Sequence, residues 1–401
     1  MDVFAKCYKP SLADKARELE IYPYFHALES RQDTEVVMEG KRRIMLGSNN
    51  YLGLTTHPEV IEAGVRALEK YGSGCSGSRF LNGTLELHLE LEKELAAFLR
   101  KEAAVTFSTG FQSNLGIISA IVGLGDYVIM DRENHASLYD ACRLSFGKML
   151  RFRHNDMADL EKKLASVPET AGCLIVTDGV FSMGGDIANL PEICCLAKQY
   201  GARVMVDDAH GLGVIGEGGR GTASYYGLED EVDVYMGTFS KSLASLGGYM
   251  AASAQVVDYV KHASRPFIFS ASITPSGCAS ALAALKILER HPELPETLQS
   301  RALFMREKLR EHNIRMRESN GEPNPIIPIY TYEVIPTLTI AKDLYDRGVY
   351  FNSTLPPAVA PGECLLRTSL MATHTEALIE EAVGIIADVL RKHSIGESEH
   401  E

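Results

Sequence analysis

Residues 203–248, RVMVDDAHGLGVIGEGGRGTASYYGLEDEVDVYMGTFSKSLASLGG, decide the fold. The apolar run at 204–206 has no polar face, which is typical of a buried strand in a parallel sheet. Asp207 and His210 follow this run, and Lys241 follows a second apolar run further along. Ligands of open α/β sheets bind at the carboxyl ends of the strands. We therefore expect these three side chains to face one cleft.

These three residue types together predict a pyridoxal phosphate (PLP) site. A lysine amine condenses with an aldehyde to form a Schiff base. An aspartate beside the pyridine nitrogen keeps that nitrogen protonated, so that the ring can accept electrons. Lys241 is the candidate for the Schiff base, Asp207 for the pyridine partner and His210 for a bond to the ring hydroxyl. Each alone has an ordinary explanation, such as a solvated lysine or an aspartate that caps a turn.

Length and composition narrow the class of protein. A chain of 401 residues predicts more than one domain. The net charge of −13 disfavours nucleic-acid binding through a basic surface. No run of about 18 apolar residues and no signal-like N-terminus is present, so we expect a cytoplasmic protein without a membrane span. The eight cysteines and twelve histidines lack metal-ligand spacing, and we expect no metal and no disulfide framework.

Three domains are predicted along the chain. Residues 1–50 form an N-terminal arm that packs on another surface, because the aromatic cluster at 22–25 needs burial. Residues 51–285 form the large domain, which contains an amphipathic helix at 58–71 with four apolar residues on one face, Val60, Ile61, Val65 and Leu68. Residues 286–401 form a small α+β domain with strands at 326–330 and 365–369 and helices at 337–347 and 376–392.

Strands and helices alternate through the large domain. Seven strands are expected at 103–107, 127–130, 149–152, 173–177, 204–207, 233–237 and 248–252. Helices are expected at 85–100, 112–122, 138–146, 157–166, 190–200 and 275–290. This order predicts an α/β fold in which a mostly parallel seven-stranded sheet carries helices on both faces.

Two further stretches follow strands of this sheet. The strand at 103–107 leads through Gly110 into a helix, and a glycine turn at a helix N-terminus favours phosphate. Thr238 and Ser240 add hydroxyl donors to the same anion site. His135 follows the strand at 127–130, where an imidazole can stack on a flat ring. Its ordinary alternative is a helix N-terminus capped by Asn134.

The motifs together resemble a known family, the α-oxoamine synthases, which are fold-type-I PLP enzymes like aspartate aminotransferase. The resemblance runs from about residue 22 to residue 389. It rests on SNNYLGL (48–54), GSGCSGSRFLNGT (72–84), FSTGFQSN (107–114), ENHAS (133–137), DGVFSMGGD (178–186), VDDAHGLGVIG (206–216), GTFSKSLASLGG (237–248) and LLRTSLMATHT (365–375).

The resemblance implies a role for each matching position. Lys241, Asp207 and His210 take the roles given above, and His135 is the stacking histidine. Phosphate contacts fall on Gly110, Phe111, Thr238 and Ser240, and a further cofactor contact falls on Ser182. Arg367 grips the amino-acid carboxylate, with Asn49 beside it and Ser78 shaping the pocket. Ser272 reaches the phosphate of a second subunit, in a homodimer whose sites lie at the interface.

Two positions depart from the family pattern. Asp208 stands where many relatives have glutamate, and the loop at 356–361 reads PPAVAP instead of PPATP. The first change touches the neighbour of the pyridine aspartate, and the second touches loop closure. Neither affects the expected reaction class.

The family reaction is a decarboxylative Claisen condensation of an amino acid with an acyl-CoA. The segments KYGSGCSGSRFLNGTLELH and GTFSKSLASLGG are especially similar to the bacterial branch that joins L-serine to palmitoyl-CoA and yields 3-ketosphinganine. This branch implies lipid synthesis and leaves peripheral membrane contact open. The alternatives are glycine with acetyl-CoA or succinyl-CoA, and alanine with pimeloyl-CoA. A retro-aldol lyase and a non-catalytic partner subunit are alternatives of other classes, although the presence of Lys241 argues against the subunit.

Overall fold

A seven-stranded sheet forms the centre of the computed structural model, which describes residues 2–321 and 323–395. The strand order is β3-β9-β8-β7-β6-β4-β5. Strand β9 runs antiparallel to β3 and β8, and the other neighbours are parallel. The predicted mostly parallel sheet is confirmed. Its strands are β3 (Ala103–Phe107), β4 (Tyr127–Asp131), β5 (Lys148–Phe152), β6 (Cys173–Asp178), β7 (Arg203–Asp207), β8 (Val234–Thr238) and β9 (Gly248–Ala252).

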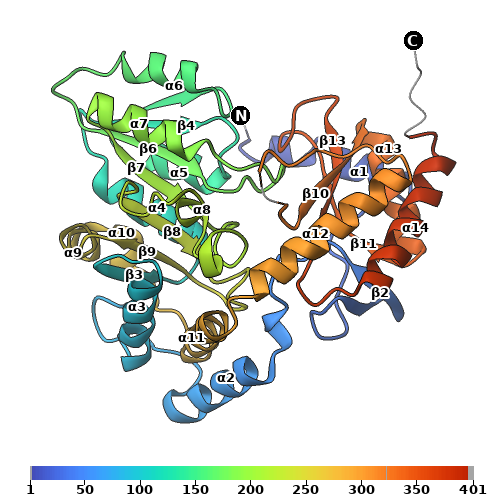
Figure 1. The fold of residues 1–401 in the computed structure, drawn as a ribbon, viewed down its shortest axis with the longest axis horizontal. Helices are drawn as coiled ribbons and strands as arrows, with labels where there is room; N and C mark the ends of the chain where they lie inside the picture. Colours follow the sequence, from blue (N-terminus) through green and yellow to red (C-terminus); the bar gives the residue numbers. More distant parts are fainter. Residues whose placement is uncertain (1, 322, 396–401) are drawn as a thin grey trace.

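Helices cover both faces of this sheet, as predicted (Figure 1). Side chains alternate along a strand, so Val204 and Val206 enter one core while Met205 enters the other. The first core is covered by α3 (Glu86–Phe98), α6 (Met157–Leu164), α7 (Leu190–Tyr200), α8 (Thr222–Tyr226) and α11 (Pro275–Arg290). The second is covered by α4 (Gly110–Ile121), α5 (Ala136–Leu144), α9 (Ala254–Ala263) and α10 (Arg265–Ile268).

A second, smaller body joins the two ends of the chain. Its strands are β1 (Glu35–Met38), β2 (Lys41–Met45), β10 (Ile326–Tyr332), β11 (Val349–Tyr350), β12 (Asn352–Thr354) and β13 (Cys364–Ser369). Its helices are α12 (Leu294–Glu311), α13 (Val334–Asp346) and α14 (Glu376–Lys392). β11 pairs in parallel with β2, so blue β2 lies among the orange and red C-terminal elements (Figure 1). We still propose domain boundaries at residues 50 and 285. Strands β1 and β2 of the first segment share a sheet with β11 of the last segment.

The N-terminal segment before β1 lies partly exposed. It contains a short 3-10 helix, η1 (Ala5–Tyr8), and α1 (Leu12–Glu18). Phe25 is 93% exposed in the single chain. The burial that we expect for its aromatic cluster therefore requires a further surface.

Helix α2 (Pro58–Tyr71) has the predicted bounds, but most of its predicted apolar face is exposed in the single chain. Val60 is buried together with Gly64 and Ala67, whereas Ile61, Val65 and Leu68 are exposed. Small residues carry the contact because α11 approaches closely: a Cβ added at Gly64 would lie 3.0 Å from Ser280 Oγ. The large apolar residues are therefore left on the surface.

Two short 3-10 helices complete the structure, η2 (Leu54–Thr56) and η3 (Glu217–Gly219). Within the described part of the chain, none of the helices combines the length and the apolar character that crossing a membrane requires.

Candidate active site

Asp207 ends β7 with a buried carboxylate held in one orientation. Asn114 on α4 donates from Nδ2 to Asp207 Oδ2 at 2.7 Å. The backbone N–H of Ala209 donates to Asp207 Oδ1 at 3.1 Å. A buried carboxylate fixed by two donors is suited to pair with a protonated ring nitrogen.

Lys241 lies three residues beyond β8, next to β7 in the sheet. Burial lowers the pKa of Lys241 to about 8, against the opposing effect of Asp207, while Arg367 lowers it further. The ε-amine is therefore more readily deprotonated than a lysine in water, as a nucleophile or general base requires.

Asp207 and Lys241 line one cavity of about 210 Å³ at the carboxyl edge of the sheet. At one end of this cavity lies the N-terminus of α4, where Gly110 packs so closely that a Cβ would meet the Thr238 side chain at 2.9 Å. The Thr238 and Ser240 hydroxyls lie 2.8 Å apart and also line the cavity. Helix N–H groups and hydroxyls make this end an anion site.

His135 borders the same cavity and caps α5. Its backbone N–H donates to the Asp178 carboxylate at 3.2 Å, and its Nδ1 lies 2.7 Å from Ser137 Oγ. Burial lowers the pKa of His135, although Asp207 opposes this shift. A neutral imidazole in a fixed orientation therefore faces the space beside Asp207.

A second cavity of about 550 Å³ meets the first at His135, His210 and Lys241. Arg367 on β13 lines it, together with Asn49 and Ser182. Arg367 donates from Nε to the Ser182 carbonyl at 2.5 Å and from Nη2 to Tyr51 Oη at 3.2 Å.

His210 is joined to this arginine through Tyr51. Tyr51 Oη lies 2.7 Å from His210 Nδ1, and both side chains are buried. Burial and the positive charges of Lys241 and Arg367 hold the pKa of His210 well below its ordinary value. Eleven of the sequence-predicted residues thus border the two joined cavities: Asn49, Gly110, Phe111, His135, Ser182, Asp207, His210, Thr238, Ser240, Lys241 and Arg367.

Ser78 and Ser272 do not border either cavity among the described residues. Ser78 bridges to Ala271, and the Ser272 backbone N–H donates to the Gly77 carbonyl at 3.0 Å. The glycine-rich loop at 72–84 therefore lies against the turn that contains Ala271 and Ser272, as an ordered structure. The roles implied for Ser78 and Ser272 stay predictions.

Comparisons with known proteins show the family of this chain. The sequence profile of the family described as aminotransferase class I and II matches residues 41–386. The chain belongs to this family. The serine palmitoyltransferase of Sphingobacterium spiritivorum is 50% identical over 385 residues, which cover 96% of each chain. An 8-amino-7-oxononanoate synthase of Geobacter sulfurreducens is 44% identical over 376 residues, covering 93% of this chain and 95% of the relative. Within the aminotransferase family, the chain is therefore an α-oxoamine synthase.

Solved structures show the same relationship. The serine palmitoyltransferase of Sphingomonas wittichii superposes with a TM-score of 0.94 at 37% identity, covering 98% of this chain and 99% of the other. A serine palmitoyltransferase structure with PLP gives 0.94 at 38% identity, covering 98% and 100%. The predicted fold-type-I architecture is confirmed by these neighbours.

The two departures from the α-oxoamine synthase pattern have different surroundings. Asp208 points away from the cavities: its carboxylate accepts hydrogen bonds from the Thr222 backbone N–H at 2.7 Å and from Thr222 Oγ1 at 2.6 Å. Burial raises the pKa of Asp208 to about 6, although the bonds from Thr222 oppose the shift. The PPAVAP loop, in contrast, lines the second cavity through its first three residues.

Three site residues of this α-oxoamine synthase were missed by the sequence reasoning: Tyr51, Asn114 and Asp178. Each lies inside a motif quoted above, in SNNYLGL, FSTGFQSN and DGVFSMGGD. Asn114 lies one helical turn after Gly110, and that spacing could have indicated a side chain on the cavity face. Nothing comparable in the sequence indicates that Tyr51 reaches across to His210.

Proposed function

We propose that this chain is a serine palmitoyltransferase that uses PLP to condense L-serine with a long-chain acyl-CoA, near palmitoyl, to 3-ketosphinganine, CoA and CO2. One observation carries the proposal: Lys241 borders both a small cavity with an anion site and a larger cavity with Arg367. The relatives named serine palmitoyltransferase that are 50% identical over nearly the whole chain support the choice of substrates.

The residues of the small cavity fit PLP. The α4 N-terminus, Thr238 and Ser240 would hold the phosphate, and Asp207 would hold the pyridine nitrogen. His135 would stack on the ring and His210 would bond the ring oxygen. When bound, PLP supplies an electron sink for the charge that develops at the α-carbon of the amino acid.

Four side chains would then act on L-serine, each in a different role. Arg367 binds the carboxylate, since a guanidinium is suited to a bidentate carboxylate contact. Lys241 takes the α-proton, because burial leaves its amine deprotonated in part near neutral pH. His135 orients the carboxylate and donates to the oxygen that gains charge when the thioester is attacked. Ser78, a small polar residue, leaves room for the hydroxymethyl group.

The larger cavity supplies apolar surface for the acyl chain. Leu12, Tyr24, Met183, Leu355 and Ala358 line it. A buried methylene contributes about 0.8 kcal/mol, so such a wall favours long chains. Among the described residues that line this cavity, the lysine is Lys241 and the arginine is Arg367. Both lie where the amino acid binds. A pimeloyl or succinyl chain, which ends in a carboxylate, lacks a further cation here.

We also propose a cytoplasmic homodimer that acts in sphingolipid synthesis. The exposed row of Ile61, Val65 and Leu68 on α2 supports a second subunit, because these residues recur on one helical face. Ser272 would reach the partner's phosphate site in this dimer.

A CoA-release assay with four substrate pairs tests the proposal. L-serine with palmitoyl-CoA should give the highest kcat/KM, above glycine with acetyl-CoA, glycine with succinyl-CoA and alanine with pimeloyl-CoA. The relatives named 8-amino-7-oxononanoate synthase make alanine with pimeloyl-CoA the second candidate. A higher value for any pair other than serine and palmitoyl-CoA contradicts the proposed substrates.

A further inference from the structure

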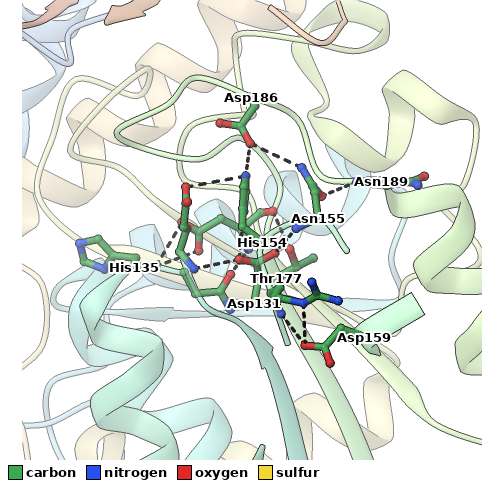
Figure 2. A network of polar contacts seen from close by, with 12 residues as sticks. Asp131, His135, His154, Asn155, Asp159, Thr177, Asp186 and Asn189 are labelled. Atoms are coloured by element: carbon green, nitrogen blue, oxygen red, sulfur yellow. Dashed lines mark hydrogen bonds and ion pairs between the residues drawn. The ribbon is translucent and has the colours of Figure 1, made fainter. Parts of the chain in front are cut away.

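A partly buried histidine lies outside the two cavities, behind the loop that carries His135. His154 follows β5 and lies between two carboxylates (Figure 2). Its Nδ1 lies 3.0 Å from Asp131 Oδ1, and its Nε2 makes a hydrogen bond to Asp186 Oδ2. The His154 side chain is 15% exposed, and those of Asp131 and Asp186 are 1% and 6% exposed.

Both ring nitrogens of His154 face a carboxylate, so both must donate a proton. Burial opposes the positive charge, but the hydrogen bonds and charges of Asp131 and Asp186 outweigh it and raise the pKa of His154 to about 10. Glu133 lies 3.7 Å from Nε2, and Arg317 lies 3.3 Å from Asp186 Oδ1. Among the described residues, no group of three or more His, Cys, Asp or Glu side chains has the arrangement of a metal site. The cluster is a charge cluster centred on an imidazolium.

One carboxylate of the cluster orders the loop that leads to His135. Asp131 ends β4 and accepts from the backbone N–H groups of Glu133, at 2.8 Å, and Asn155, at 2.9 Å. Asn134 continues this loop by bonding to the carbonyl of Val176 at 2.9 Å. His154 therefore holds the strand end from which His135 projects.

Asp186, which supplies the other carboxylate, closes the turn that contains Ser182 through its backbone carbonyl. The backbone N–H of Phe181 donates to the Asp186 carbonyl at 2.9 Å, and Gly185 N–H donates to the Phe181 carbonyl at 2.9 Å. The His154 ring packs edge-on against Phe181, with ring centroids 4.4 Å apart. Within this turn, Ser182 offers the carbonyl that accepts from Arg367 Nε. A chain of contacts thus runs from His154 through Asp186 and the turn to Arg367.

We propose that His154, as an imidazolium clamped by Asp131 and Asp186, is a positioning residue that sets the turn 181–186 against Arg367. It touches neither cavity, so it acts through the Ser182 carbonyl and not on the substrate. The inference rests on the proposed function for the identity of the amino acid, because Arg367 is the residue that would bind its carboxylate. Loss of His154 leaves two buried carboxylates without their shared partner, and the turn loosens.

The test uses His154→Gln, which keeps one donor and removes the charge, in the full chain with PLP. L-serine binding, measured from the change in cofactor absorbance, should weaken about tenfold, the scale of one charged hydrogen bond. The KM for palmitoyl-CoA should change by less than about twofold, because the site that binds the acyl chain lies away from the substituted residue. Asp186→Asn is the second variant and should show the same split if His154→Gln does not fold.

A readout without cofactor separates this inference from the function. In the apoprotein, hydrogen exchange of the 179–189 peptide should rise in His154→Gln, while exchange in the α14 peptide should not. His374→Gln is the control, because His374 is a buried histidine that accepts a hydrogen bond from the Met371 backbone N–H in the small domain; this variant should leave serine binding unchanged. If the wild-type protein uses glycine instead, the proposed substrate is wrong, and glycine replaces serine in the same measurement. Unchanged amino-acid binding in a folded variant, or equal losses for both substrates, overturns the role of His154.

Discussion

Lys241, which is partly buried, and Arg367, which is buried, border the same site and have different roles in it. Arg367 is held by Tyr51 and the Ser182 carbonyl, with a guanidinium suited to a bidentate carboxylate contact. Lys241 loses its proton more readily, because burial and the nearby arginine both lower its pKa. One residue can therefore bind a carboxylate while the other acts as a base.

The pKa of Lys241 predicts how PLP loading depends on pH. The ammonium form cannot attack an aldehyde, and the pKa of about 8 means that the amine form grows as pH rises through 8. The rate of PLP binding to the apoprotein, followed by stopped-flow absorbance, should therefore rise with pH and level off above about 8. A rate that keeps rising until about pH 10, the ordinary lysine range, contradicts this expectation.

Replacing Arg367 should weaken amino-acid binding without removing the cofactor. Arg367→Ala loses a charged hydrogen bond of about 1.5–3 kcal/mol, so the Kd for L-serine should rise about 10- to 100-fold. Cofactor absorbance titrations measure this Kd. Arg203→Ala serves as the control, because Arg203 forms an exposed ion pair with Asp233. An unchanged Kd in Arg367→Ala would remove this residue from the substrate site.

Elements with strong local patterns were predicted closely. The bounds of α7, α11 and α14 agree with the apolar periods read from the sequence, as do those of β3 and β9. These elements carry their own signals: proline at the start of α11 and Gly201 just after α7 mark the ends of these two helices. Contacts between elements were harder to predict from the sequence than the bounds of the elements. The close approach of α2 and α11 through Gly64 could not be read from the pattern of large apolar residues.

Elsewhere, contacts between segments that are far apart in the sequence could not be predicted. Helix α12 was not predicted, although its buried residues Leu298, Ala302 and Met305 recur every three or four positions and could have indicated it; the rest of its sequence is polar. The pairing of β2 with β11 joins segments about 300 residues apart and has no local signature. Within the site, the strand-end residues were predicted because topology places them on one edge. Tyr51, which lies outside the sheet, was not.

The glycine-rich loop before α3 is held by a buried ion pair. Arg79 donates to Glu92 at 2.6 Å and to Thr106 Oγ1 at 2.7 Å, with both charged side chains 6% exposed. Arg79→Ala leaves Glu92 buried without this partner, so unfolding free energy should fall by about 3–5 kcal/mol. Urea unfolding measures it. Arg79→Met combined with Glu92→Leu should regain much of the loss, and equal stability of Arg79→Ala and wild type would show that the pair does not hold the loop.

At the scale of the whole molecule, the site draws on both bodies of the chain. Asp207 and Lys241 come from the seven-stranded sheet, whereas Arg367 comes from β13. The exposed row on α2 belongs to the large body and faces away from the chain's own core. The surface that we propose for a second subunit is thus separate from the contact between the two bodies.

Val65→Asp tests the proposed homodimer. The side chain is 47% exposed in the single chain, so the charge should leave the fold intact and weaken self-association. Sedimentation velocity should show a dimer for the wild type and a shift toward monomer for the variant. Arg66→Asp, on the polar side of α2, is the control and should stay dimeric. A wild-type protein that is monomeric and fully active contradicts the homodimer.

The reaction itself is tested most directly by following the carboxyl carbon of L-serine. With carboxyl-labelled L-serine and palmitoyl-CoA, we expect labelled CO2 and free CoA in equal amounts, together with an unlabelled 2-amino ketone detected by mass spectrometry. Lys241→Ala should release neither above background. Release of CoA without labelled CO2, or conversion of serine to labelled glycine, would contradict a decarboxylative condensation at Lys241.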